Sequence, residues 1–352
     1  MSVPHYSNLS PNPTPRPFSA LPIHPSILTN PPPSPPAQAS RALSLLPPAE
    51  RAACLRYYHL RDAKMALASA LLKHYAVARL AAVPWDATAI GRDARTKPVY
   101  VDPATGRAPV AFNVTHQAGV VALVAVAGYR PRRHGHGHGA VGKDAGEEEE
   151  EAVQVGVDLV CTSERRDRDQ AMLRADGWSA FVDMHGDVFA PREVGYLKHR
   201  VLSAVPGLVA AAGSGDGGAV TGEQIADGKL RAFYALWALR EAYVKLTGEA
   251  LLAEWLGELE FREFRPPRPT AGWDVPADEG DEAAQVVRRM DIWFRGVKVE
   301  DVNMCLRAMG PDYMIATAVR TPGNKEDGLG WRLGAYEMLS LEEVLDFAEA
   351  SR

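Results

Sequence analysis

The chain has 352 residues, of which 46% are hydrophobic and 24% charged, and its formal net charge is -5. This composition is typical of a globular protein of about two domains, and the charge excludes nucleic-acid binding driven by overall positive charge. Three widely separated cysteines, Cys54, Cys161 and Cys305, exclude a disulfide scaffold and a cysteine-based zinc site and predict a reducing, cytoplasmic location. No apolar run approaches the roughly 20 residues of a membrane span, so we expect no membrane partner.

Residues 1–40 predict a disordered arm, because they are rich in proline and serine and no acidic residue precedes Glu50. Organelle import is the alternative, but transit peptides are rich in arginine and Arg16 is the only arginine or lysine before Arg41. The chain then favours an N-terminal subdomain over 41–130. Its predicted elements are helices at 48–59 and 61–80 and strands at 99–101, 110–113 and 120–127.

Residues 131–152 predict a solvated insertion, with a histidine-glycine alternation followed by a run of glutamates. Metal binding by the histidines is the alternative, but flexible glycine spacing provides no fixed ligand geometry. We expect a C-terminal subdomain over 153–335 and a C-terminal helix within 336–352. The predicted elements are strands at 153–160, 259–264, 292–299 and 313–319, helical structure within 165–205, a helix at 229–246, and loops at 207–228 and 265–288.

Three stretches place polar residues at or within apolar elements. Residues 112–119 read FNVTHQAG just before the buried strand, which indicates either a ligand site or a polar turn. Asp158 interrupts an apolar strand, so it either is paired or metal-bound or faces solvent from an edge strand. In the helix, Glu241 and Lys245 form either a functional pair or a surface ion pair worth roughly 0.2–0.5 kcal/mol.

The order of these stretches resembles the 4'-phosphopantetheinyl transferases of the broad-specificity, surfactin-synthetase-activating type. That family carries F-N-x-S-H, then G-x-D, then W-x-x-K-E-x-x-x-K. Here the motifs read FNVTHQAG at 112–119, GVD at 156–158 and WALREAYVK at 237–245. Basic segments at 58–64 and 95–99 precede them, as in the family. The resemblance covers about residues 41–320 and is strongest to the eukaryotic, fungal-like branch.

The resemblance implies an α+β fold built as a pseudo-dimer of two similar α/β subdomains, with coenzyme A in the cleft between them. It implies a monomeric enzyme that transfers the 4'-phosphopantetheine arm of coenzyme A to a serine of an acyl or peptidyl carrier domain and releases adenosine 3',5'-bisphosphate. Family carriers belong to fatty acid synthase, polyketide synthase, non-ribosomal peptide synthetase and the aminoadipate reductase of lysine biosynthesis. The alternative is a catalytically impaired homologue that binds coenzyme A or a carrier domain.

The resemblance also assigns roles to residues. Asp158 and Glu241 would hold Mg²⁺ or Mn²⁺, with Gln117 or water as a further ligand. Glu241 would be the general base, and Lys245 would stabilise charge on the pyrophosphate. The residues that would bind coenzyme A are Arg61, Arg92, Arg95, Lys97, Asn113, Thr115, His116 and Lys245.

The chain departs from the family pattern at several positions. Thr115 stands in place of serine and keeps the hydroxyl, while Arg240 stands in place of lysine and keeps the charge. Val160 occupies the position of a second acid in bacterial relatives, so one metal ligand is missing. The first strand of the family is not recognisable in residues 1–40.

Overall fold

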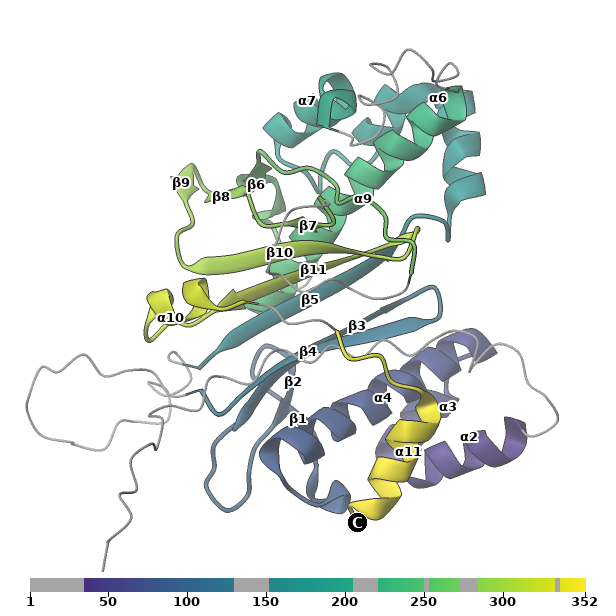
Figure 1. The fold of residues 1–352 in the computed structure, drawn as a ribbon, viewed down its shortest axis with the longest axis vertical. Coiled ribbons are helices and arrows are strands. Elements are labelled where there is room, and N and C mark those ends of the chain that lie inside the picture. Colours follow the sequence, from purple (N-terminus) through teal and green to yellow (C-terminus); the bar gives the residue numbers. More distant parts are fainter. Residues whose placement is uncertain (1–34, 130–151, 205–220, 250–252, 273–283, 333–335) are drawn as a thin grey trace, which may run out of the picture.

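A computed structural model describes residues 35–129, 152–204, 221–249, 253–272, 284–332 and 336–352 (Figure 1). The fold is a mixed α+β arrangement in which helices cover the outer faces of antiparallel strands. The predicted arm up to residue 34 and the predicted histidine-rich insertion at 131–151 lie outside the described residues.

The N-terminal half is helical first and then forms two hairpins. Helix α4 packs against the β3–β4 hairpin, where Leu71 and Tyr75 share a core with Phe112 and Leu123. The hairpin pairs Val110 with Ala127 through to Gln117 with Val120. Its elements are α2 (Pro35–Ser44), α3 (Pro48–Leu55), α4 (Leu60–Ala81), η1 (Trp85–Ala87), β1 (Ile90–Arg92), β2 (Pro98–Tyr100), β3 (Val110–Gln117) and β4 (Val120–Ala127).

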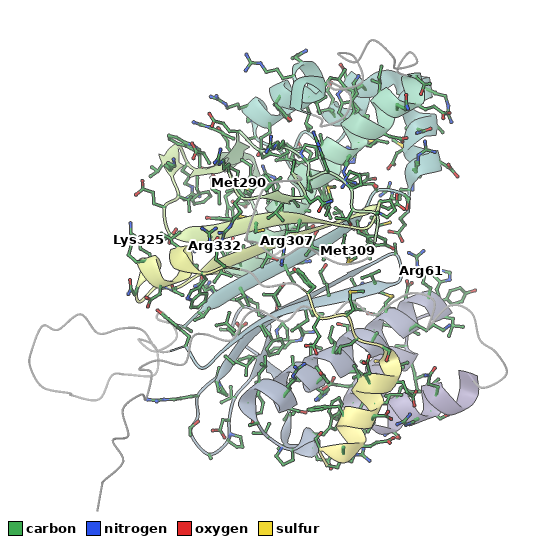
Figure 2. All side chains as sticks on the ribbon, in the orientation of Figure 1. Arg61, Met290, Arg307, Met309, Lys325 and Arg332 are labelled. Carbon is green, nitrogen blue, oxygen red and sulfur yellow. The ribbon has the colours of Figure 1, made fainter. Side chains whose placement is uncertain are left out.

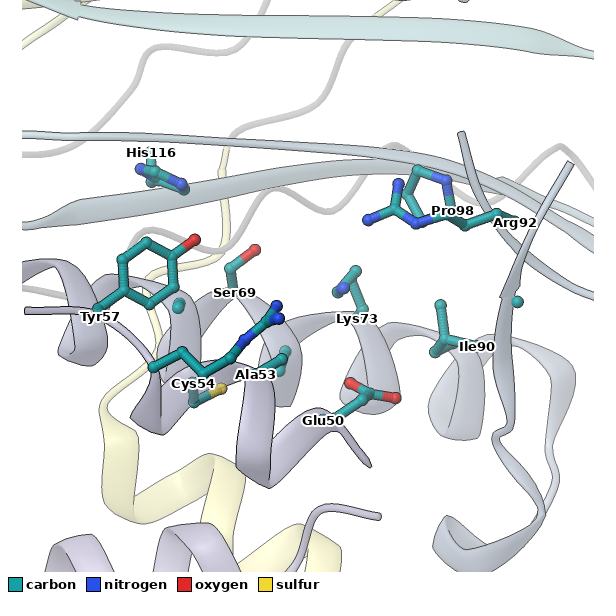
Figure 3. A pocket seen from close by; sticks show the side chains of 14 residues that line it. Glu50, Ala53, Cys54, Tyr57, Ser69, Lys73, Ile90, Arg92, Pro98 and His116 are labelled. Carbon is teal, nitrogen blue, oxygen red and sulfur yellow. The ribbon is translucent and has the colours of Figure 1, made fainter. Parts of the chain in front are cut away.

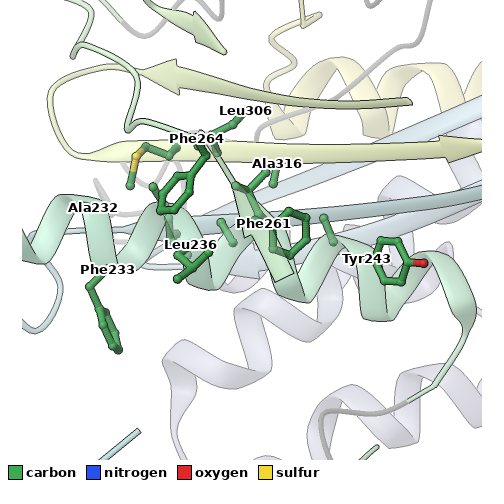
Figure 4. Packing of buried hydrophobic residues seen from close by; sticks show 14 of the residues in the cluster. Ala232, Phe233, Leu236, Tyr243, Phe261, Phe264, Leu306 and Ala316 are labelled. Atoms are coloured by element: carbon green, nitrogen blue, oxygen red, sulfur yellow. The ribbon is translucent and has the colours of Figure 1, made fainter. Parts of the chain in front are cut away.

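The C-terminal half is built on a four-stranded antiparallel sheet with the order β5-β11-β10-β7. The long helix α9 covers one face, where Phe233, Leu236 and Tyr243 pack with Phe261 and Leu306 (Figure 4). The strands are β5 (Gln154–Cys161), β6 (Leu259–Arg262), β7 (Val286–Val287), β8 (Asp291–Phe294), β9 (Val297–Lys298), β10 (Val302–Met309) and β11 (Tyr313–Arg320). The helices are α6 (Arg166–Asp183), α7 (Pro191–His199), η2 (Val201–Ala204), α9 (Gly222–Thr247), η3 (Leu256–Glu258), α10 (Lys325–Gly330) and α11 (Leu341–Ala350).

Helix α11 returns from the C-terminal half to the N-terminal core (Figure 1). It begins with a capping box in which Ser340 and Glu343 satisfy each other's backbone amides. Its apolar face buries Leu341, Val344 and Leu345 in the same core as α4. Arg41 of α2 binds Glu342, Asp346 and Glu349 on its polar face. The last helix therefore belongs structurally with the first ones.

The two halves meet where the β3–β4 hairpin lies against β5 (Figure 1). Val120 and Val124 of β4 pack with Leu159 of β5 and Ile315 of β11. This contact brings the FNVTHQAG and GVD motifs side by side. None of the helices in the described ranges is both long enough and apolar enough to cross a membrane.

Several predicted boundaries are wrong. Helix α2 begins at Pro35, inside the predicted arm of residues 1–40. Helix α9 begins at Gly222, inside the predicted 207–228 loop, because Thr221 and Gln224 form a capping box. Strand β7 lies inside the predicted 265–288 loop.

Two further differences concern strands. The predicted strand at 292–299 is a hairpin of β8 and β9 that turns at Arg295 and Gly296, whose φ angles are 52° and 75°. Strand β10 had no counterpart among the predicted elements.

Candidate active site

Alternate side chains of β3 reach across to β5. Because successive residues of a strand face opposite sides, Asn113, Thr115 and Gln117 point the same way. The amide of Val157 donates to Asn113 Oδ1 at 3.1 Å, and the amide of Cys161 donates to Gln117 Oε1 at 3.1 Å. The polar-turn alternative is therefore wrong for residues 112–117, which belong to β3, and only Ala118 and Gly119 form the turn to β4.

Asp158 is the buried centre of this junction. Although β5 is the outermost strand of its sheet, the β3 hairpin covers it and leaves Asp158 only 7% exposed. Thr115 Oγ1 donates to Asp158 Oδ1 at 3.1 Å, and Lys245 Nζ donates to the same oxygen at 2.6 Å. Burial raises the pKa of Asp158, and the Lys245 ammonium opposes that rise. The solvent-facing alternative for Asp158 is excluded.

Helix α9 brings Glu241 and Lys245 to the same junction from its last two turns. Burial and the nearby Asp158 carboxylate raise the pKa of Glu241 to about 7, although Lys245 lowers it. Lys245 also donates to Thr115 Oγ1 at 3.2 Å. The alternative of a plain surface pair is wrong, because Lys245 bonds to a buried aspartate and Glu241 is largely removed from water.

Gly156 allows α9 to come this close to β5. A Cβ at this position would lie 2.0 Å from the carbonyl oxygen of Ala242 and 2.6 Å from the amide of Leu246. Asp158 is two residues further along β5 and so faces the same side as Gly156. The glycine of the GVD motif therefore sets the separation between the strand with Asp158 and the helix with Glu241.

A cavity of about 670 Å³ lies in the N-terminal half, lined by residues of α3, α4, β1, β2 and β3 (Figure 3). His116 of β3 lies at one side of it, and Lys73 of α4 and Arg92 of β1 lie toward the other side. Partial burial and the Lys245 ammonium lower the pKa of His116, which favours the neutral ring near pH 7. The remaining lining residues are Glu50, Ala53, Cys54, Arg56, Tyr57, Ala66, Ser69, Ala70, Ile90, Gly91 and Pro98.

Two carboxylates and an ammonium, together with a cation-lined cavity, suit the handling of a phosphate ester. The family model described as the 4'-phosphopantetheinyl transferase N-terminal domain matches residues 32–128, and the model of the 4'-phosphopantetheinyl transferase superfamily matches residues 154–288. The chain belongs to the 4'-phosphopantetheinyl transferase superfamily. The resemblance drawn from the three motifs is thereby confirmed.

This phosphopantetheinyl transferase is similar over most of its length to curated fungal proteins. It is 44% identical over 311 residues to 4'-phosphopantetheinyl transferase 1 of Fusarium mangiferae, which covers 88% of this chain and 87% of the relative. It is 36% identical to 4'-phosphopantetheinyl transferase A of Aspergillus fumigatus, over 80% of this chain and 78% of the relative. It is 32% identical to 4'-phosphopantetheinyl transferase NpgA of Emericella nidulans, over 82% of each chain. The prediction of an enzyme of this class is confirmed.

Of the residues predicted to bind coenzyme A, the structure places His116 and Arg92 at the cavity. Arg61 lies at the border between the two halves, where it pairs with Glu164 of the C-terminal half (Figure 2). Glu164 also accepts from Gln117 Nε2 at 2.9 Å. One glutamate therefore joins a predicted phosphate ligand to a predicted metal ligand.

Arg95 and Lys97 do not line the cavity, and their side chains lie at the end of α9. Arg95 Nη1 donates to the carbonyl oxygen of Thr247 at 2.8 Å. Lys97 Nζ donates to the carbonyl oxygens of Leu246 at 3.2 Å and Val155 at 3.4 Å. Both side chains are thus bound to backbone carbonyls, contacts that no local sequence pattern indicates.

The donor set at the junction fits a hard divalent cation. Within the described ranges no three histidine, cysteine, aspartate or glutamate side chains form a metal-binding group. Asp158 and Glu241 are close enough that the charge of one raises the pKa of the other, and a shared cation would relieve that repulsion. Mg²⁺ is usually held by one or two carboxylates and completes its shell with water and substrate phosphates. Asp158 and Glu241 match that number of carboxylates.

Several residues of the site were missed. Glu164 follows β5 with no local pattern that marks it, because its importance comes from contacts with Arg61 and Gln117. Lys73 had a usable signal: with Ser69 it forms a polar stripe, at a spacing of four, on a helix that is otherwise largely apolar.

Proposed function

We propose that this transferase moves the 4'-phosphopantetheine arm of coenzyme A to a serine hydroxyl of an acyl or peptidyl carrier domain. Family membership implies coenzyme A as the substrate and a carrier protein as the acceptor. The observation that carries the proposal is the cluster of Asp158, Glu241 and Lys245 at the contact between the two halves. The charges of Lys245 and Asp158 act on the pKa of His116, which lines the cavity.

The cavity is the proposed site for the adenosine bisphosphate part of coenzyme A. All of its lining residues come from the N-terminal half, and Arg56, Lys73 and Arg92 supply positive charge. We propose that coenzyme A extends from there to the contact between β3, β5 and α9, so that the reaction takes place between the two halves. The pseudo-dimer relationship of the halves is part of the same proposal.

In the proposed reaction, Glu241 and Lys245 have different roles. The serine oxygen forms a bond to the phosphorus that carries the pantetheine arm, and the pyrophosphate P–O bond breaks to release adenosine 3',5'-bisphosphate. Glu241, with its pKa near 7, accepts the serine proton directly or through water. Lys245 stabilises the negative charge that develops on the phosphates.

Asp158 and Glu241, assisted by Gln117, would hold Mg²⁺ or Mn²⁺, and the ion would neutralise phosphate charge when bound. Gln117 Oε1 already accepts a hydrogen bond from the Cys161 amide, which orients it from β5. We propose the two carboxylates as the main ligands and the Gln117 oxygen as an auxiliary one.

Intact-mass spectrometry of an apo carrier domain tests the proposal. The carrier is incubated with the purified transferase, coenzyme A and Mg²⁺, and parallel reactions contain Glu241→Ala or a chelator. A gain of one phosphopantetheine in the complete wild-type reaction alone supports the transfer and the roles of Glu241 and the ion. A folded protein that binds coenzyme A but modifies no carrier would support the binding-only alternative and overturn the proposal.

A further inference from the structure

The β1–β2 turn of the N-terminal half holds the end of the helix that carries the catalytic groups. The last carbonyls of an α-helix have no partner within the helix, and cations are favoured at that end. At the end of α9, the carbonyl oxygen of Thr247 accepts from Arg95, and that of Leu246 accepts from Lys97. Gly248 ends the helix with a φ of 81°, and a Cβ there would lie 2.9 Å from Lys97 Cδ and 3.1 Å from Arg95 Cδ. The two side chains are therefore packed tightly against the helix end.

The turn that presents these side chains is itself held in one conformation. Asp93 Oδ1 accepts from the amides of Arg95 at 2.9 Å and Lys97 at 2.8 Å. The amide of Asp93 donates back to the Lys97 carbonyl at 3.0 Å, and Thr96 adopts a φ of 65° between the two cations. These internal hydrogen bonds hold the turn so that Arg95 and Lys97 both point toward the end of α9.

Lys97 joins two backbone segments that each carry a catalytic or metal-binding group. Its Nζ bonds to Leu246, next to Lys245 on α9, and to Val155, three residues before Asp158 on β5. At Gly156, directly after Val155, α9 lies so close to β5 that a Cβ would meet its backbone. The amine thus bridges helix and strand at the point where their spacing sets the distance between Glu241 and Asp158.

We propose that Arg95 and Lys97 are positioning residues of the transfer reaction, which hold α9 and β5 in register, and are not ligands of the coenzyme A phosphates. Neither side chain lines the cavity, and the amino group of Lys97 already lies on two carbonyl oxygens. The effect on kcat rests on the proposed function. The claim that these two side chains stabilise the end of α9 does not depend on it.

Steady-state kinetics of Lys97→Met and Arg95→Met separates the two roles. A misplacement of about 1 Å costs on the order of 100-fold in rate, so we expect kcat to fall at least about tenfold. The KM for coenzyme A should stay within about twofold of the wild type, because no phosphate contact is lost. Lys73→Met is the contrast: loss of a cavity cation should raise that KM by about tenfold. Lys298→Met, on exposed β9, should change neither constant.

Amide hydrogen exchange of the unliganded protein supplies a second readout that needs no activity. Lys97→Met should accelerate exchange in the last turn of α9, from Val244 to Gly248, and leave exchange in α4 unchanged. Arg95→Met provides the same test at a more exposed position, where global unfolding is not expected. If the wild type transfers nothing, the proposed function fails while this exchange result still decides the structural claim.

If Lys97→Met raises the KM for coenzyme A, leaves kcat unchanged and leaves exchange in α9 unchanged, the inference is overturned. Lys97 would then be a ligand of the coenzyme A phosphates.

Discussion

Arg240 of α9 and Glu193 of α7 form an ion pair whose side chains are 1% and 2% exposed. Glu193 also accepts from the amides of Phe261 at 2.7 Å and Ala190 at 2.9 Å. Arg240 Nη2 donates in addition to the carbonyl oxygen of Leu259 at 2.8 Å. One buried pair thus joins α7, α9 and β6, and its arginine directly precedes Glu241.

Replacement of one partner should destabilise the protein strongly. Glu193→Gln leaves the Arg240 guanidinium buried without a counter-charge, so the free energy of unfolding should fall by about 3–5 kcal/mol. Urea denaturation at neutral pH measures the change. The matched control is Glu258→Gln, which breaks a pair with Arg295 whose side chains are 47% and 61% exposed and should cost at most about 1 kcal/mol. Equal losses in the two variants would contradict the importance of burial.

Gly156→Ala should damage both stability and transfer. The added methyl group meets backbone atoms of α9 at 2.0 Å, so the helix must move away from β5, at a cost of about 1–3 kcal/mol. Thermal denaturation and a transfer assay measure the two effects. Gly195→Ala in α7 is the control, because a Cβ there has nothing within 4 Å and should stabilise the helix by up to about 1 kcal/mol. A Gly156→Ala protein as stable and as active as wild type would show that α9 does not need this close approach.

Glu241→Gln should remove activity without loss of stability. General-base catalysis contributes roughly 10²–10⁴-fold, and the kcat for transfer should fall by that factor. The melting temperature should stay the same or rise, because burial and Asp158 disfavour the charged carboxylate that the amide replaces. Glu223→Gln, at the exposed start of the same helix, should affect neither quantity. A Glu241→Gln enzyme with wild-type kcat would exclude Glu241 as the base.

Cys54 offers a direct probe of the cavity. It lines the cavity, whereas the other two cysteines, Cys161 and Cys305, do not. Adenosine 3',5'-bisphosphate, which carries no thiol, should slow the alkylation of Cys54 by iodoacetamide. Its effect on Cys161 and Cys305 should be negligible. Peptide mass spectrometry after timed quenching measures the three rates. Unchanged Cys54 alkylation at saturating nucleotide would place the nucleotide elsewhere.

Elements with a strong local pattern were predictable. The apolar periodicity of 61–80 became α4 at Leu60–Ala81, and the β-branched run 120–127 became β4 with the same bounds. In both cases the pattern reflects the face that is buried, so a local reading suffices.

Strand β10 shows the limit of such patterns. Leucine, methionine and alanine, which favour helices, make up much of Val302–Met309, and Asn303 and Arg307 interrupt its apolar residues. Its strand conformation is decided by pairing with β11 along all eight residues. That pairing depends on a partner strand and cannot be read from the segment alone.

The sequence by itself determined the family of this transferase, because the order of the motifs and the residue types within them are specific to it. The same motifs predict Asp158, Glu241, Lys245 and His116 as site residues. The tertiary structure alone decided where the long cationic side chains bind. Arg61 pairs with the Glu164 carboxylate of the other half, and Arg95 and Lys97 bind carbonyl oxygens at the end of α9. A lysine or arginine side chain can bind phosphate, carboxylate or carbonyl oxygens, so its partner depends on which of these groups the fold brings within its reach.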